Sequence, residues 1–249
     1  MNIVVCISSV PDTTSKINFT ENGSNFDSSG VQFVINPYDE FGLTKAMMLK
    51  EVSGGGKVTI ITVGDATVEP VMRKALAIGA DEAIRINMTA TDSYSTATEI
   101  SNYLKSNPAD LIITGKESID YNGGAVGGMI AEMMKLPFIN ACIGLEVNGS
   151  KTKLIREIEG GKENILANLP FVIGGQKGLV QESELRIPNM RGIMQARSKP
   201  LNIIEPTANE SMTESLNFKK PAEKGSCKLV DSNDVAKLVS LLQNEAKVI

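Results

Sequence analysis

The chain has 249 residues and a formal net charge of −4, from 25 basic and 29 acidic side chains. Since nucleic-acid-binding domains carry an excess of basic residues, this charge argues against a nucleic-acid partner. The sequence contains no histidine, which excludes histidine-based nucleophiles and histidine-ligated metals. Its three cysteines are widely spaced and form no CxxC pair, which argues against a thiolate zinc site or a redox dithiol.

The first apolar run, residues 3–7, is typical of a strand that is buried on both faces of a parallel sheet. No basic segment precedes this run, so it does not have the pattern of a signal peptide. No apolar stretch reaches the roughly 18 residues that a membrane span needs. We therefore expect a cytoplasmic protein without membrane insertion.

The polar residues 12–30 predict a loop with a small hairpin, and a short strand follows at 31–35. Asn36-Pro37 ends that strand, and apolar spacing predicts a helix over 38–52. Strands and helices then alternate: strands at 58–63, 83–86, 111–114 and 137–142, and helices at 68–79, 93–105 (capped by Asp92) and 125–135. This alternation predicts an α/β fold, with a mostly parallel twisted sheet and helices on both faces.

The pattern changes after residue 143. Residues 151–158 and 163–169 alternate with a period near two around a glycine turn, which predicts an antiparallel hairpin. Prolines interrupt the region 174–224, and an amphipathic helix is expected over 231–245. We interpret 1–183 as a nucleotide-binding domain and 184–249 as an arm. The arm packs either on a partner subunit or on its own domain.

In an open α/β sheet, ligands bind beyond the carboxyl ends of the strands. The loops expected there are Ser8–Asp12, Asn36–Asp39, Gly64–Thr67 and Gly115–Gly124. Glycines in the last loop let backbone N–H groups approach a phosphate at a helix N-terminus, although a flexible turn has the same pattern. The Asn36–Asp39 segment either caps the next helix or offers polar groups to a base or ribose. No carboxylate pair, activated nucleophile or metal cluster is recognisable, so we expect neither catalytic residues nor a metal site.

Six motifs occur in a fixed order along the chain: Val10-Pro11-Asp12, Asn36-Pro37-Tyr38-Asp39-Glu40, Arg73–Asp81, Thr114–Asp120, Arg156–Gly161 and Ile187–Arg197. With these motifs the sequence resembles the β subunit of electron transfer flavoproteins over essentially its whole length. The resemblance implies a fold similar to the adenine nucleotide α-hydrolases. It also implies a heterodimer with an α subunit, which holds most of the redox-active FAD.

The resemblance further implies that this subunit binds one AMP, with Cys6 and Val63 forming an apolar wall for adenine. The cofactor-binding residues that it implies are Cys6, Asn36, Pro37, Tyr38, Asp39, Val63, Gly64, Gly115, Lys116, Glu117, Ser118, Ile119, Asp120, Tyr121, Asn122, Gly123, Gly124, Ala125, Val126 and Glu157. Among them, Tyr38 is expected to approach the flavin, and Glu157 to face an arginine of the α subunit. Thr13 stands where many relatives have an aromatic residue against the flavin.

The segment Glu182–Arg197 resembles the loop with which the family recognises its dehydrogenases. Ile187, just before a Pro-Asn pair, is the expected apolar anchor, and the docking residues implied are Ile187, Met190, Arg191, Ile193 and Arg197. The function implied is that of an electron carrier and not an enzyme. It would take electrons from acyl-CoA or similar flavin dehydrogenases, as in fatty acid oxidation, and pass them to a quinone-linked acceptor.

Two alternatives remain open. Some family members bind a second FAD in place of AMP, and they oxidise NADH and bifurcate electrons. The start Val10–Thr13 and the pair Val126-Gly127 resemble those members, whereas Gly123 and Ala125 depart from them. The other alternative is a stand-alone adenine-nucleotide-binding regulator, against which the arm from 184 onward counts.

Overall fold

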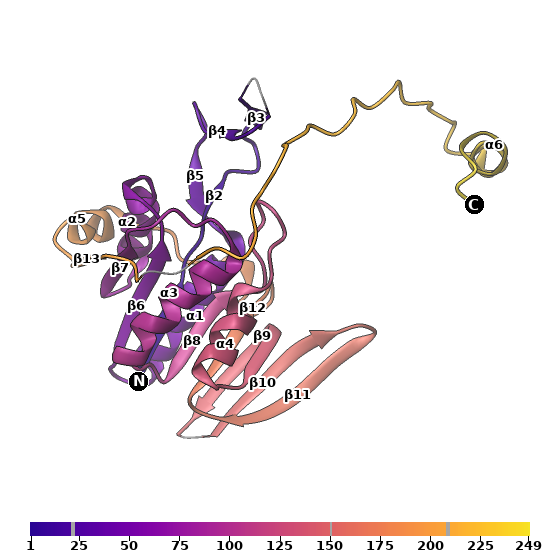
Figure 1. The fold of residues 1–249 in the computed structure, drawn as a ribbon. Coiled ribbons are helices and arrows are strands. Elements are labelled where there is room, and N and C mark those ends of the chain that lie inside the picture. The colour runs from indigo at the N-terminus through magenta and orange to yellow at the C-terminus, as the bar shows by residue number, and fades with distance from the viewer. Residues whose placement is uncertain (21–22, 150, 208–209) are drawn as a thin grey trace. The chain divides into compact units, whose positions relative to one another are not determined.

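The computed structural model describes residues 1–20, 23–149, 151–207 and 210–249 (Figure 1). It contains two compact units. The larger comprises Met1–Ile17 and Asp27–Leu216, and the smaller comprises Asn18–Phe26 and Asn217–Ile249. Residues 184–216 therefore belong with the sheet domain, so this division falls later in the chain than the expected one between 183 and 184.

A nine-stranded sheet forms the larger unit (Figure 1). Its strands are β1 (Asn2–Cys6), β6 (Lys57–Val63), β7 (Glu82–Ile86), β8 (Leu111–Gly115), β9 (Phe138–Asn148), β10 (Lys151–Ile158), β11 (Gly161–Asn168), β12 (Phe171–Gly175) and β13 (Leu201–Ile204). Their order is β11-β10-β9-β12-β8-β1-β6-β7-β13. All neighbours from β9 to β13 in this order are parallel, and β10 and β11 add an antiparallel hairpin. The predicted fold class is confirmed.

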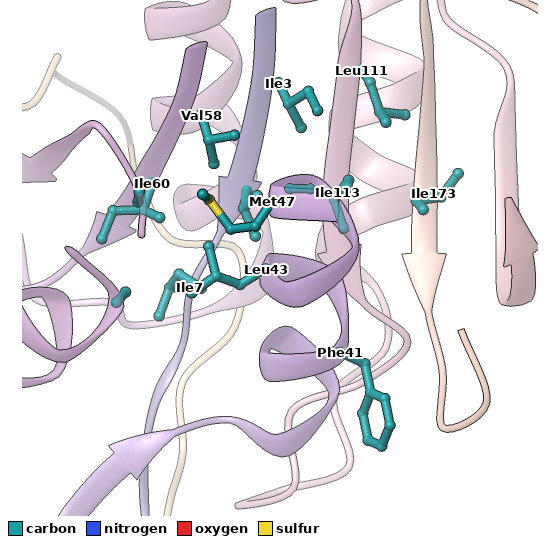
Figure 2. Close-up of a cluster of buried hydrophobic side chains, with 14 of the residues drawn as sticks. Ile3, Ile7, Phe41, Leu43, Met47, Val58, Ile60, Leu111, Ile113 and Ile173 are labelled. Atoms are coloured by element: carbon teal, nitrogen blue, oxygen red, sulfur yellow. The ribbon is translucent and has the colours of Figure 1, made fainter. Parts of the chain in front are cut away.

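Helices cover both faces of this sheet. They are α1 (Pro37–Val52), α2 (Glu69–Ile78), α3 (Ser93–Ser106) and α4 (Val126–Met134). In β1, Ile3 and Val5 pack in the core that α1 and α2 close, whereas Val4 and Cys6 pack in the core under α3 and α4. Figure 2 shows the first core, with Leu43 and Met47 of α1 against the sheet. Burial on both faces explains why the strand is a continuous apolar run.

The helix termini follow the local sequence. Asp92 accepts a hydrogen bond from the N–H of Ser95 at 2.7 Å, so the predicted cap of α3 is confirmed. Pro37 is the first residue of α1, a position where its missing N–H costs nothing. Short elements complete this part of the chain: β2 (Ser9–Pro11) pairs with β5 (Phe33–Ile35), and η1 (Ala66–Val68) precedes α2.

The smaller unit contains the predicted small hairpin. Strand β3 (Asn18–Phe19) pairs with β4 (Phe26–Asp27), of which only Phe26 is counted in this unit, and the ring of Phe19 stacks on that of Phe218 with centroids 5.3 Å apart. The expected C-terminal helix starts later than predicted, as α6 (Val235–Leu241), and continues as the π-turn η3 (Leu242–Ala246). It begins there because Asp234 accepts a hydrogen bond from the N–H of Lys237 at 3.1 Å.

Strands β12 and β13 and helix α5 arise where the sequence predicted no element. Strand β12 lies between β8 and β9 and is buried throughout, so it shows no alternation. Strand β13 fits between Pro200 and Pro206, which flank the edge strand and leave its ladder intact. Helix α5 (Met190–Ala196) starts after Asn189, whose side chain accepts from the N–H of Gly192 at 2.7 Å.

Candidate nucleotide-binding site

The chain reverses its direction across the sheet next to β1. From β1 the chain passes through α1 to β6, which is the neighbour of β1 on one side. Strand β8, later in the chain, is the neighbour of β1 on the other side. Ligands of open α/β sheets bind at such a point, beyond the carboxyl ends of the strands. A cavity lies there, between the ends of β1, β6 and β8 and the helices α1, α3 and α4.

Most of the expected cofactor-binding residues meet in this cavity. Those that line it are Cys6, Asn36, Asp39, Val63, Gly115, Glu117, Ser118, Asp120, Tyr121, Gly123, Gly124 and Val126. Others lie in the same segments but outside the lining: Pro37, Tyr38, Gly64, Lys116, Ile119, Asn122 and Ala125. Glu157 lies on β10, outside the cavity, and accepts a hydrogen bond from the side-chain amide of Gln176.

The cavity also includes residues outside the expected cofactor-binding set: Ser8 and Ser9, which belong to the loop Ser8–Asp12 named above, and Ile7, Ile61, Thr62, Val68, Thr96, Ile100, Thr114 and Gly127. Several of these continue the strand ends already singled out. Thr96 and Ile100 come from α3, where their spacing places them on one face of the helix. That spacing was visible in the sequence, but nothing local indicated which ligand or cavity the face meets.

The loop after β8 is a compact turn. The N–H of Ser118 donates to the carbonyl of Gly123 at 2.9 Å, and Asn122 between them has a φ of 54°. Asn36 joins this turn to the start of α1: its Nδ2 donates to the carbonyl of Glu117 at 2.9 Å, and its Oδ1 accepts from the N–H of Ile119 at 3.3 Å. Asn36 therefore orients the loop and does more than precede the helix.

The N-terminus of α4 points its first turn at the cavity, because Val126 and Gly127 are lining residues. No described side chain caps this terminus, so the first N–H groups of the helix remain available to an anion. Gly127 allows the close approach of α4 to β8, since a Cβ there would lie 2.6 Å from the Oγ1 of Thr114. The glycines of this loop thus have a packing role besides their conformational freedom.

Asp39 is the buried carboxyl of the site, with 2% of the residue exposed. Burial raises its pKa to about 7, although hydrogen bonds from the N–H groups of Ser8 and Gly115 and from Asn36 act in the opposite direction. Burial, together with the nearby charge of Asp39, also raises the pKa of the Cys6 thiol. Cys6 is therefore a small apolar wall residue and not a nucleophile.

Tyr38 lies at the start of α1, next to the cavity. Its hydroxyl donates to Oε1 of Glu117 at 3.2 Å, and burial, followed by the charge of Glu117, raises the pKa of the phenol. The tyrosine is therefore a neutral hydrogen-bond donor near neutral pH. This contact orients its ring relative to the loop after β8.

The expected docking segment forms η2 (Glu182–Glu184), an extended stretch and α5. Ile187 and Met190 are 84% and 76% exposed, and Ile193 is 43% exposed. Arg191 and Arg197 are exposed on α5 and directly after it. The segment therefore presents exposed apolar side chains beside two exposed arginines.

Two cations attach α5 to α2. Arg73 donates through Nη1 to the carbonyls of Ala196 and Lys199, both at 2.8 Å. In return, the Nζ of Lys199 donates to the carbonyls of Leu76 at 2.9 Å and Ala80 at 2.6 Å. Arg73 of α2 thus meets the C-terminal end of α5, and Lys199, three residues after α5, meets the C-terminal end of α2, where positive charge is favourable.

Within the described ranges, no group of three or more cysteine, aspartate or glutamate side chains is placed to hold a metal ion. Along the same part of the chain, no helix is both long and apolar enough to cross a membrane.

The sheet order and the cavity at its switch point define an α/β domain of the doubly wound class. A family model described as "Electron transfer flavoprotein domain" matches residues 24–209. The chain belongs to this family and is a β subunit within it, which confirms the expected resemblance.

Curated relatives agree over the full chain. The electron transfer flavoprotein subunit beta of Bacillus subtilis is 36% identical, and the alignment covers 100% of both chains. The subunit of the same name from Syntrophomonas wolfei is 31% identical, over 100% of this chain and 98% of that one. The chain is also 28% identical to caffeyl-CoA reductase-Etf complex subunit CarD of Acetobacterium woodii, over 99% of this chain and 98% of that one.

Proposed function

We propose that this chain pairs with an electron transfer flavoprotein α subunit and serves in the cytoplasm as part of an electron carrier, without transforming a substrate itself. The observation that carries the proposal is the cavity at the switch point, which combines an apolar strand-end wall with an uncapped helix N-terminus. A site with these two sides matches a nucleoside phosphate. The similarity to β subunits along the whole chain supports the same conclusion.

The two sides of this cavity suit the two ends of AMP, its base and its phosphate. On the β6 side, Val63 and Val68 offer an apolar surface for adenine, and Ile100 of α3 adds to it. On the α4 side, the backbone around Gly124 and Val126 offers N–H groups to a phosphate.

The described lining contains three acidic side chains, Asp39, Glu117 and Asp120, and Glu117 accepts a hydrogen bond from the hydroxyl of Tyr38. Asp120 accepts from the hydroxyl of Ser118 and from the N–H of Tyr121, so its charge is directed into the loop. The pKa of Asp39, raised to about 7 by burial, leaves that group partly neutral at physiological pH.

FAD, bound mainly by the α subunit, would supply the redox chemistry by accepting and releasing electrons. In this chain, Tyr38 is the residue we propose to lie next to the flavin, with its hydroxyl oriented by Glu117. Glu157 is exposed and accepts a hydrogen bond from Gln176, and we propose that it meets an arginine of the α subunit. Both residues lie outside the lining of the AMP cavity, so the two cofactors would contact separate residues of this subunit.

Flavin dehydrogenases, such as those for acyl-CoA, would dock on the segment Glu182–Arg197 and a quinone-linked acceptor would take the electrons. The exposed side chains of Ile187 and Met190 support a docking role, because they give the segment an apolar centre. The residues 217–249, in the smaller unit, are the part of the arm that we propose to pack on the α subunit. Leu229 and Val235 are exposed there and need such a partner to be buried.

A second FAD in place of AMP, with oxidation of NADH, is the alternative. The retained Val126-Gly127 pair at the start of α4 favours it, as does the similarity to a subunit named for a reductase complex. Gly123 and Ala125 favour AMP. A stand-alone nucleotide-binding regulator is disfavoured, because the similarity to β subunits extends through the arm.

The nucleotide content of the purified heterodimer tests these proposals. The complex is denatured, and the released nucleotides are separated and counted per heterodimer. One FAD and one AMP is the expected result. Two FAD without AMP would replace the proposal by the NADH-oxidising alternative, and the absence of any adenine nucleotide besides the α subunit's FAD would contradict both.

A further inference from the structure

Arg85 is a buried cation on β7, with 4% of the residue exposed, and it does not line the nucleotide cavity. Its Nη1 donates to the carbonyl of Gly64 at 3.0 Å and to Oδ1 of Asn87 at 2.9 Å. Its Nε lies 3.1 Å from Oε1 of Glu69. Because a buried guanidinium is costly unless it is paired, this set of contacts needs an explanation beyond general packing.

Most of these contacts belong to one turn. Gly64 directly follows β6, and Glu69 is the first residue of α2, so both ends of the β6–α2 connection meet the guanidinium. Asp65 between them is also close: hydrogen bonds from Thr67, and after them the charge of Arg85, lower the pKa of its carboxyl. The arginine therefore fixes the position of the whole connection.

The connection in turn forms the apolar wall of the cavity. Gly64 packs tightly under Val68, because a Cβ on Gly64 would lie 2.6 Å from Cγ1 of Val68. Val68 and its neighbour across the turn, Val63, both line the cavity. A displacement of the Gly64 carbonyl would therefore move the surface that receives the base.

We propose that Arg85 is a positioning residue for nucleotide binding, which sets the base-side wall of the cavity from behind through the carbonyl of Gly64. This inference rests on the proposed function, in which that wall contacts adenine. The phosphate side, at α4, makes no contact with Arg85 through the bonds described above. Lysine cannot reproduce the role fully: one ammonium could replace Nη1 at Gly64 and Asn87, but it has no second nitrogen in the position of Nε, which faces Glu69 as an ion pair without a hydrogen bond.

The test uses the full chain purified in complex with its α subunit. The complex is freed of bound nucleotide, and its affinities for radiolabelled AMP and then for adenosine are measured by equilibrium dialysis. We expect Arg85→Met to weaken the binding of AMP at least tenfold. The binding of adenosine should weaken by the same factor, because the change affects the side of the cavity that receives the base. Arg85→Lys should retain an intermediate affinity. It also keeps the test valid if the methionine variant does not fold.

The matched control is Leu154→Ala on β10, where the residue is 1% exposed and lies outside the cavity. It should lower the melting temperature at least as much as Arg85→Met and leave AMP affinity within twofold of the original protein. If both Arg85 variants bind AMP within twofold of the original protein, or if Leu154→Ala loses as much AMP affinity as Arg85→Met, the inference about Arg85 is overturned and the proposed function still stands. Failure of the original protein to bind AMP would overturn the proposed function and this inference with it.

Discussion

The backbone N–H of Ser8 donates a hydrogen bond to Oδ2 of Asp39 at 2.7 Å, which joins the end of β1 to the first turn of α1. The N–H of Gly115, at the end of β8, bonds to the same carboxyl. Three segments that are distant in sequence thus converge on one buried group at the floor of the candidate site. The protonation of Asp39 is therefore coupled to the geometry of the cavity.

The stability of the protein should depend on pH through Asp39. Burial raises its pKa from 3.8 to about 7 in the folded protein, so the folded state binds the proton more tightly than the unfolded chain does. Its contribution to stability is full below about pH 4 and is lost as the pH rises through 7. We expect the free energy of unfolding, relative to Asp39→Asn, to fall by roughly 4 kcal/mol across this window. Urea titrations of both proteins at successive pH values measure it.

Asp12 provides the control for that experiment. Hydrogen bonds from the side chain and N–H of Thr14 lower the pKa of this exposed carboxyl. The contribution of Asp12 to stability therefore changes with pH in the opposite direction to that of Asp39. Its contribution to stability is present above its unfolded pKa and is lost as the pH falls through the lowered folded value. A pH profile for Asp39→Asn that runs parallel to that of the original protein would contradict the coupling.

Gly115 should not tolerate a side chain. A Cβ there would lie 2.3 Å from Oδ1 of Asp39 and 2.9 Å from the Cβ of Tyr38, so Gly115→Ala forces the end of β8 away from α1. We expect a loss of about 1–3 kcal/mol in the free energy of unfolding. Gly161→Ala, at an open position of the β10–β11 hairpin, is the control and should change it by less than about 0.5 kcal/mol. Equal effects in the two variants would mean that the close packing at Gly115 is unimportant.

The local signals in the sequence were sufficient for most of the fold. The apolar run 3–7 and the Asp92 cap each depend on neighbours a few residues away, and both are found as predicted. Strand β12 was missed because a strand buried on both faces has no alternation, and its place between β8 and β9 is set by long-range pairing.

The candidate site divides in the same way. Strand ends and glycines located the cavity, since they follow from topology and backbone conformation. The burial of Asp39 and the contact of Arg85 with Gly64 depend on pairs 31 and 21 residues apart, and neither pair forms a local pattern. For Glu157, the resemblance alone suggested a role, and the structure adds its bond to Gln176.

The attachment of α5 should depend on Lys199. Because Lys199→Met leaves the carbonyls of Leu76 and Ala80 without their charged donor, we expect a loss of about 1–3 kcal/mol in stability. Amides of α5 should exchange with solvent faster in this variant, as hydrogen exchange would show. Lys177→Met removes a lysine whose ion pair with Glu182 is exposed, so its effect should not exceed about 1 kcal/mol. Unchanged protection of α5 in Lys199→Met would argue that other contacts carry the attachment.

Ile187 should affect docking without affecting folding. Since 84% of the residue is exposed, Ile187→Ser should change the free energy of unfolding by less than about 0.5 kcal/mol. If its side chain fills a pocket of a flavin dehydrogenase, the KM of that dehydrogenase for this protein as electron acceptor should rise about tenfold or more. Such a rise corresponds to a loss of roughly 1.4 kcal/mol in binding. Leu166→Ser changes an equally exposed side chain on β11, outside the docking segment, and should leave that KM unchanged. A rise in KM of the same size in both variants would indicate a general loss of apolar surface, and an unchanged KM in Ile187→Ser would remove Ile187 as the anchor.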